Sequence, residues 1–233
     1  MNSLISADKI SAGYQGHPVV RDLSIEVRAG EILAILGPNG AGKTTTLLTL
    51  SGELPTLRGA LRVNGRASKL PLHRRAAAGL AYVTEERSVF MGLSVADNLR
   101  LGRCEIDRAV ELFPELVPLM KRPAGLLSGG EQQMLTLGRA LARGPRVLLA
   151  DELSLGLAPL IVARLLQAVR RAADSGVGVV LVEQHVSQVL KIADYVCVLR
   201  RGEVVLSASR QEAAGRLGDI EASYLDLPAD GRS

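Results

Sequence analysis

Aromatic residues are scarce in this sequence, which has no tryptophan and only 3% Phe, Trp and Tyr over 233 residues. Proteins that bind single-stranded nucleic acid stack its bases on aromatic side chains and follow its phosphates with clustered basic residues. The net charge here is only +4, and no run of Lys and Arg exceeds two residues. We therefore expect no nucleic acid among the partners, and a scattered basic surface that could face anionic lipid.

Cysteine, histidine and long apolar runs are scarce as well. The chain has two cysteines, Cys104 and Cys197, and three histidines, with no CxxC spacing, so neither a zinc site nor a disulfide framework is indicated. The longest apolar runs, such as residues 32–36 and 177–182, fall far short of the roughly 18 to 20 residues that span a bilayer. These absences favour a chain in the reducing cytoplasm without a membrane span of its own.

Strand and helix patterns alternate along most of the chain. Apolar and polar residues alternate over 23–27, which predicts a half-buried strand, whereas the apolar run 31–36 predicts a strand covered on both faces. Residues 94–143 have a helical pattern and are interpreted as an inserted helical subdomain. Because strands alternate with helices around it, we predict an α/β fold with a mainly parallel sheet. The other strands are expected at 61–63, 80–83, 147–150 and 177–182, with a hairpin over 195–206 that turns at 201–202. The helices are expected at 45–50, 95–101, 108–120, 130–142, 160–173 and 186–193.

A glycine-rich loop follows the buried strand. Residues 37–44 read GPNGAGKT and match the phosphate-binding pattern GxxxxGK[ST], between a strand and a helix start. Glycines let the backbone approach closely, so that N–H groups and the helix N-terminus converge on phosphate oxygens. The pattern predicts that Lys43 reaches the β- and γ-phosphates of ATP and that Thr44 ligates Mg²⁺. The residues expected to bind the nucleotide here are Gly37, Asn39, Gly40, Ala41, Gly42, Lys43, Thr44 and Thr45.

Two carboxylates follow the apolar strand at 147–150. Asp151 and Glu152 would lie at the carboxyl edge of the sheet, where open α/β sheets bind their ligands. Asp151 is expected to hold Mg²⁺ through water, and Glu152 to orient or deprotonate the attacking water. Alone, such a strand end is more often merely solvated, but the phosphate-binding loop upstream favours the functional interpretation.

Residues 127–133 read LSGGEQQ and open an amphipathic helix. Ser128 with Glu131 three residues later is a capping box, which explains the pattern without any ligand. Two glycines in a first helical turn, however, cost on the order of 1 kcal/mol each. They are favourable where a ligand must approach the backbone, and from the residues alone both interpretations stay open.

In order and spacing, residues 37–44, 127–133 and 147–152 resemble the Walker A, signature and Walker B motifs of ATP-binding-cassette (ABC) ATPases. The resemblance covers about residues 9–206 and implies a P-loop NTPase fold of the ABC type, with an antiparallel β subdomain beside the parallel core. We expect a single ABC ATPase domain over residues 1–233, divided into a core at 1–84 and 146–207, a helical subdomain at about 85–145, and a C-terminal helix and tail at 208–233.

The resemblance also implies a nucleotide shared between two subunits. In this family two ATPase subunits pair head to tail, so Ser128, Gly129 and Gly130 would contact ATP that is bound mainly by a partner. Tyr14 occupies the position of the aromatic residue that stacks on adenine, although an ordinary strand-surface tyrosine is the alternative. Residues 154–158 match the D-loop, which links the paired sites.

Two positions depart from the usual family pattern. Glu85 stands where a glutamine is expected after the strand 80–83; a carboxylate can also approach Mg²⁺, and a solvated acidic loop is the alternative. The histidine that contacts the γ-phosphate should follow the strand 177–182, where this chain has Gln184 and then His185. Either side chain could serve as this switch, so both remain candidates.

Residues 85–90, 111–114, 127–134, 154–159 and 181–184 look like the LivF type of ATPase subunit in branched-chain amino acid importers. This resemblance implies a peripheral protein on the inner face of the cell membrane that energises import. Its partners would be two transmembrane permease subunits, a second ATPase subunit of the same or a different kind, and an external solute-binding protein. Importers of urea or amides and exporters of lipid or polysaccharide are the alternatives.

Other classes of ABC protein fit the sequence less well. ATPases of this family in DNA repair or translation carry a coiled-coil insertion, a zinc module or a second cassette, and none is evident here. A nucleotide-binding regulator without catalysis would be expected to lack Glu152, which is present.

Overall fold

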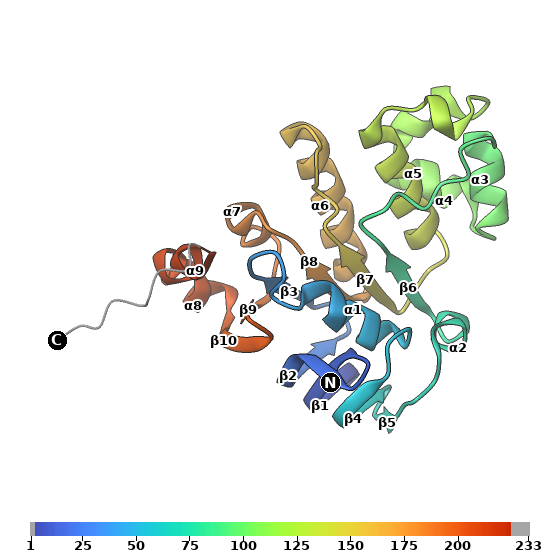
Figure 1. The fold of residues 1–233 in the computed structure, drawn as a ribbon. Helices are drawn as coiled ribbons and strands as arrows, with labels where there is room; N and C mark the ends of the chain where they lie inside the picture. Colours follow the sequence, from blue (N-terminus) through green and yellow to red (C-terminus); the bar gives the residue numbers. More distant parts are fainter. Residues whose placement is uncertain (1–2, 225–233) are drawn as a thin grey trace.

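The computed structural model describes residues 3–224, and the end of the expected tail, 225–233, lies outside them. Two sheets form the centre of the molecule (Figure 1). The antiparallel sheet has the strand order β2-β1-β4-β5, and the larger sheet has the order β10-β9-β3-β8-β7-β6. All neighbouring strands of the larger sheet pair in parallel except β10, which pairs antiparallel with β9. The predicted mainly parallel core and antiparallel β subdomain are therefore confirmed.

The strands of the larger sheet lie close to their expected bounds, whereas the strands of the antiparallel sheet extend well beyond the expected segments 23–27 and 61–63. The antiparallel sheet consists of β1 (Ser3–Tyr14), β2 (His17–Arg28), β4 (Thr56–Val63) and β5 (Arg66–Ala67). The larger sheet consists of β3 (Ile32–Leu36), β6 (Leu80–Val83), β7 (Val147–Asp151), β8 (Gly178–Val182), β9 (Tyr195–Arg200) and β10 (Glu203–Ser209). Every residue of β3, β7 and β8 is buried, as expected for strands that are covered on both faces.

Successive residues of these central strands contribute to two different hydrophobic clusters. In β3, Ile32, Ala34 and Leu36 pack on the side of α6 (Pro159–Asp174). Leu33 and Ile35 pack on the opposite side, against α1 (Lys43–Ser51) and the antiparallel sheet. Figure 1 shows this layering, with α6 on one face of the larger sheet and the antiparallel sheet on the other. Because successive side chains of a strand point to opposite faces of the sheet, the sequence of each strand determines which residues pack against α6 and which against α1 and the antiparallel sheet.

The inserted helices gather at one end of the molecule (Figure 1). They are α3 (Val95–Leu101), α4 (Ile106–Leu112), the 3-10 helices η1 (Pro114–Leu119) and η2 (Ala124–Leu126), and α5 (Gly129–Leu141). Phe113 and Leu116 are completely buried and belong to the same hydrophobic cluster as the core helix α6. The helical subdomain of the predicted fold is therefore present and shares a continuous core with the sheet.

Two expected helices differ from those in the structure. The helix expected at 108–120 is interrupted after Leu112, because Pro114 disfavours helical geometry at the preceding residue, and Phe113 has φ −134° and ψ 79°. The helix expected at 186–193 ends early, as α7 (Val186–Val189). The chain must turn there, because the Asp194 N–H donates to the Ile32 carbonyl at 2.9 Å, which aligns the next strand beside β3.

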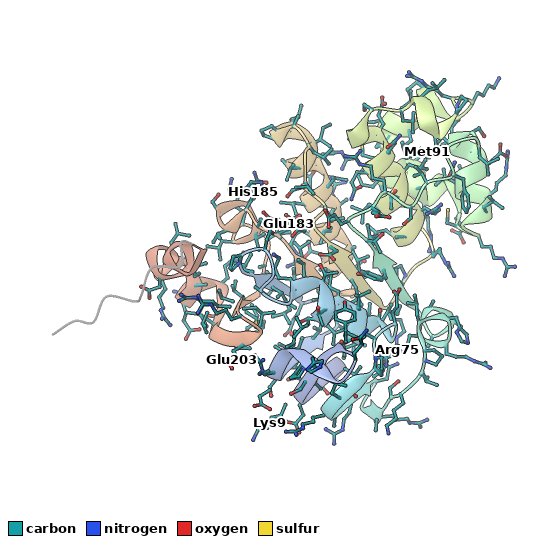
Figure 2. All side chains as sticks on the ribbon, viewed as in Figure 1. Lys9, Arg75, Met91, Glu183, His185 and Glu203 are labelled. Atoms are coloured by element: carbon teal, nitrogen blue, oxygen red, sulfur yellow. The ribbon has the colours of Figure 1, made fainter. Side chains whose placement is uncertain are left out.

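One short helix, α2 (Leu72–Ala77), was not predicted, and the single C-terminal helix expected after residue 208 is instead two short helices, α8 (Arg210–Ala214) and α9 (Leu217–Tyr224). In α2, Arg75 is only 4% exposed, and burial lowers the pKa of its guanidinium (Figure 2). The guanidinium donates to the carbonyl of Leu50 at 2.6 Å and to that of Leu70 at 2.7 Å. Since Leu50 lies in the last turn of α1, Arg75 supplies donors to carbonyls that the helix leaves without intrahelical partners.

Replacing Arg75 with alanine should remove these donors and lower the free energy of unfolding by about 1 to 3 kcal/mol. Urea denaturation followed by circular dichroism measures this change. The matched control is Arg74→Ala, an exposed neighbour on the same helix, which should change the free energy by no more than about 0.5 kcal/mol. Equal effects of the two substitutions would show that the buried hydrogen bonds do not stabilise the fold.

Candidate nucleotide-binding site

A pocket of about 410 Å³ lies at the carboxyl ends of β3, β7 and β8. This edge is where parallel α/β sheets bind their ligands. It is lined by Val19, Asn39, Gly40, Gly42, Lys43, Thr44, Thr45, Glu85, Glu152, Leu155 and Gln184. Nine of these were predicted site residues, whereas Val19 and Leu155 were not. Leu155 lies in the segment 154–158 that was singled out as the D-loop, but no sequence signal marks Val19.

The loop between β3 and α1 forms one wall of the pocket. Its shape depends on glycine, because Gly42 has φ +101° and a side chain there would meet Val20 Cγ2 at 2.7 Å. At Gly37 a side chain would meet the Leu199 carbonyl oxygen at 2.2 Å. Gly42 is the N-cap of α1 and has no side chain with which to cap it. The first N–H groups of α1 are therefore available to an anion at the helix N-terminus.

Lys43 is the cation of the pocket and is only 5% exposed. Its Nζ donates to the carbonyl oxygens of Gly37 at 2.9 Å and Pro38 at 3.2 Å. The same Nζ lies 3.5 Å from Oε1 of Glu152. The ammonium group thus holds the loop in its turn and also compensates the charge of the carboxylate across the pocket.

Asp151, the last residue of β7, is 2% exposed and is absent from the pocket lining, although it is adjacent in the chain to Glu152, which belongs to it. Burial raises the pKa of its carboxyl to about 6, and the nearby Glu152 and Glu85 carboxylates act in the same direction, while a hydrogen bond from Thr44 and the charge of Lys43 oppose them. Within the described chain, Asp151 Oδ1 is buried without a hydrogen-bond partner. A buried carboxylate oxygen that lacks a donor, beside the Thr44 hydroxyl of the phosphate-binding loop, is a suitable environment for a divalent cation.

Glu152 and Gln184 meet across the pocket. Gln184 Nε2 donates to Glu152 Oε2 at 2.8 Å and to Asn39 Oδ1 at 3.1 Å. Glu152 has φ +47°, in the left-handed region, where a residue with a side chain costs roughly 1 to 2 kcal/mol. Its N–H donates to the Val182 carbonyl at 3.0 Å, which holds it in this conformation. Backbone strain of this kind is typical of functional positions.

Eight of the predicted site residues lie outside the pocket lining: Tyr14, Gly37, Ala41, Ser128, Gly129, Gly130, Asp151 and His185. His185 is exposed and is the N-cap of α7, whereas Gln184 lines the pocket; Figure 2 shows His185 beside that helix. Tyr14 is 50% exposed at the end of β1. The structure therefore brings Gln184, rather than His185, to Glu152 and the phosphate-binding loop.

The signature segment is likewise separate from this pocket, whose lining contains none of Ser128, Gly129 and Gly130. Ser128 is exposed and forms the complete capping box with Glu131. A side chain at Gly130 would meet Ile161 Cγ2 of α6 at 3.0 Å, and one at Gly129 would meet the Arg87 guanidinium at 2.9 Å. Packing within the chain therefore explains part of the preference for glycine in this segment. From the sequence, a ligand was one of the two explanations for these glycines.

Comparison with known proteins agrees with this fold and site. Residues 20–154 match the ABC transporter family. The fold resembles that of an ATP-binding cassette of an ABC transporter in its ADP conformation, with a TM-score of 0.87 at 21% identity over 97% of this chain and 99% of that one. The fold and the site define a P-loop ATPase of the cassette type, and the chain belongs to the ABC transporter family as an ATP-binding subunit.

Several curated relatives are similar over most of their length. The chain is 41% identical over 213 residues to the high-affinity branched-chain amino acid transport ATP-binding protein BraG of Pseudomonas aeruginosa, covering 87% of this chain and 91% of the relative. It is 34% identical over 215 residues to the probable branched-chain amino acid transport ATP-binding protein LivF of Archaeoglobus fulgidus, covering 88% and 91%. It is also 34% identical over 220 residues to the lipopolysaccharide export system ATP-binding protein LptB of Escherichia coli, covering 89% and 91%.

This chain is accordingly an ATP-hydrolysing subunit that works with transmembrane permease partners. Within residues 3–224, none of the helices has both the length and the apolar composition that crossing a membrane requires.

The raised pKa of Asp151 has a consequence for folding. The folded state binds the proton more tightly than the unfolded chain, whose pKa is near 3.8, so stability is lost as pH rises from about 4 to about 6 and stays low above that range. Asp151→Asn removes the charge with little change of shape. Without nucleotide and with EDTA, the variant should be more stable than the natural chain by about 1 to 3 kcal/mol at pH 8.

Urea denaturation across this pH range measures that difference, which should shrink as the pH is lowered towards 4. A difference that does not change with pH would mean that the Asp151 carboxyl does not have a raised pKa.

Proposed function

We propose that this chain binds MgATP and hydrolyses it to energise a bacterial importer for branched-chain or other hydrophobic amino acids. The proposed hydrolysis is supported by the position of the Glu152 carboxylate in the pocket. Its Oε2 accepts a hydrogen bond from Gln184 Nε2 at 2.8 Å, and its Oε1 lies 3.5 Å from Lys43 Nζ. The similarity to BraG and LivF over most of their length supports the substrate class. LptB is 34% identical, against 41% for BraG, so an exporter is the less favoured alternative.

The residues present fit a magnesium ion. Thr44 and Asp151 supply a hydroxyl and a carboxylate, and Asp151 has the buried, unpartnered oxygen described above. Residues 3–224 contain no group of three or more His, Cys, Asp and Glu side chains arranged to hold a metal. This is consistent with Mg²⁺, which in nucleotide sites uses one or two carboxylates and completes its coordination with water and phosphate. When bound, it would neutralise charge on the phosphates; Glu85 on the pocket wall is the further candidate ligand.

The side chains of the pocket have distinct proposed roles. Lys43 and the N–H groups at the start of α1 bind the phosphates and stabilise the charge that develops during transfer. Glu152 accepts a hydrogen bond from the attacking water and orients it. Gln184 touches both Glu152 and Asn39, so it can respond to the γ-phosphate and hold the carboxylate in place. This geometry favours Gln184 over His185 as the switch.

The second half of the nucleotide site is proposed to come from another ATPase subunit, either a second copy or a different chain. Ser128 is exposed, and the pocket is open to solvent without the signature segment. In a head-to-tail pair, Ser128, Gly129 and Gly130 would close the partner's pocket, and Tyr14 would stack on adenine. The remaining proposed partners are two permease subunits and an external solute-binding protein, with this chain on the inner face of the membrane.

Substituting the pocket residues tests the catalytic roles. Glu152→Gln should keep ATP affinity but slow hydrolysis by about 100-fold or more, because general base and water-positioning groups contribute on the order of 10² to 10⁴. Gln184→Ala should slow hydrolysis by about tenfold or more, and His185→Ala should leave it unchanged. Calorimetry measures ATP affinity, and phosphate release measures turnover. A wild-type rate for Glu152→Gln, or a slow His185→Ala with a normal Gln184→Ala, would contradict these assignments.

Uptake tests the proposed substrate. Cells with and without the gene for this chain are supplied with labelled leucine, urea or acetamide, and a plasmid that encodes Glu152→Gln serves as the matched inactive control. We expect leucine uptake to fall without the chain and to recover only with the natural sequence, because transport requires hydrolysis. Loss of urea or acetamide uptake alone would assign the chain to the related importers, and unchanged uptake of all three would argue for export.

A further inference from the structure

The most buried carboxyl group near the site belongs to a residue that the proposed mechanism does not use. Glu183 is 1% exposed and follows directly after β8. Its Oε1 accepts a hydrogen bond from the Ser154 N–H at 3.1 Å, and its Oε2 accepts a short one from the Ser154 hydroxyl. In Figure 2 it lies among the central strands. Burying a carboxyl is unfavourable unless hydrogen bonds compensate it, and here both hydrogen bonds come from Ser154. The pair Glu183–Ser154 therefore forms a specific connection between two segments of the chain.

This connection joins the ends of three neighbouring strands. The Glu183 N–H donates to the Ile35 carbonyl at 3.4 Å, in the strand that leads into the phosphate-binding loop. Its side chain binds Ser154, two residues after Glu152 in the turn that follows β7. Its neighbour in the chain is Gln184. One residue thus contacts the segments that carry Lys43, Glu152 and Gln184.

The conformation of Glu152 explains why such a connection matters. Its φ of +47° is unfavourable for a residue with a side chain, so it requires support from its surroundings. The Glu152 N–H binds the Val182 carbonyl at 3.0 Å on one side. On the other side the chain is held by the two bonds from Ser154 to Glu183. Without them, the turn would be free to relax and to carry the carboxylate of Glu152 away from Gln184.

We propose that Glu183 is a positioning residue for hydrolysis, which anchors Ser154 and thereby keeps Glu152 and Gln184 in catalytic geometry. It does not touch nucleotide or water itself; it is absent from the pocket lining. This inference rests on the catalytic roles proposed for Glu152 and Gln184. A small displacement of a water-orienting group is sufficient to cost one to two orders of magnitude in rate.

The test compares four variants of the full-length chain: Glu183→Ala, Glu183→Gln, Ser154→Ala and the double variant Glu183→Ala with Ser154→Ala. Glutamine can preserve both bonds, because its carbonyl accepts from the Ser154 N–H and its amide donates to the Ser154 hydroxyl, which then acts as acceptor. Alanine at position 183 preserves neither. Turnover is measured at saturating MgATP, ATP affinity by calorimetry and stability by urea denaturation.

A matched control lies at the opposite end of the same sheet. Asp194 also accepts from a backbone N–H, that of Ile32 at 2.8 Å, and from a side chain, that of Arg170 at 2.8 Å. Asp194→Ala should lower stability and leave the turnover number of the folded protein unchanged. It therefore separates loss of a structural carboxylate from loss of catalytic positioning.

We expect Glu183→Ala to lower the turnover number by about tenfold or more with little change in ATP affinity. Glu183→Gln should restore most of the rate, and the double variant should be no slower than Glu183→Ala, because both changes break one connection. Three outcomes would overturn the proposal: a wild-type turnover number for Glu183→Ala, a Glu183→Gln variant as slow as the alanine variant, or an equal loss of turnover in Asp194→Ala. Normal hydrolysis by Glu152→Gln would instead refute the underlying catalytic assignment.

Discussion

The parallel pairing of β3, β8 and β7 is the constraint on which the site depends. Parallel neighbours end at the same edge of a sheet, so the loop after β3, Asp151 with Glu152 after β7, and Glu183 with Gln184 after β8 meet there. Val182 is paired with Ile35 on one side and with Asp151 on the other. Because alternate residues enter different hydrophobic clusters, a slip of one residue would exchange the two faces and separate these groups.

Concentrating charge at this edge opposes folding. Asp151 is almost fully buried with a raised pKa, Glu152 has a left-handed backbone conformation, and Glu183 is a buried carboxyl whose pKa burial also raises. Lys43 and the bonds from Ser154 offset part of this cost. The edge therefore has features of a preorganised site. Its polar groups are already oriented to bind an anion and its counterion, and this arrangement lowers the free energy of unfolding.

The sequence was sufficient to predict most of the fold and the side chains that meet in the pocket, because these depend on local pattern. A buried apolar run and a glycine-rich phosphate-binding loop can be recognised from local sequence, and the loop in turn favours a functional interpretation of the carboxylate pair. The choice between Gln184 and His185 cannot be made in this way, since it depends on how the chain turns between β8 and α7, where Gln184 lines the pocket and His185 is the exposed N-cap of α7. The contact of Glu183 with Ser154 spans 29 positions in the chain, and no periodicity indicates it.

The signature glycines show how a motif can meet two requirements. As the first turn of a helix, the segment is stabilised by its capping box; Gly130 also packs against Ile161, and Gly129 faces the end of the flexible Arg87 side chain. Arg87 lies two residues from Glu85, which lines the nucleotide pocket. The short segment from Glu85 to Arg87 therefore contacts both the pocket of this chain and the surface that carries Ser128. The packing constraint differs between the two glycines, because the end of the Arg87 side chain can move away from Gly129, whereas the branched Ile161 of α6 packs directly on Gly130.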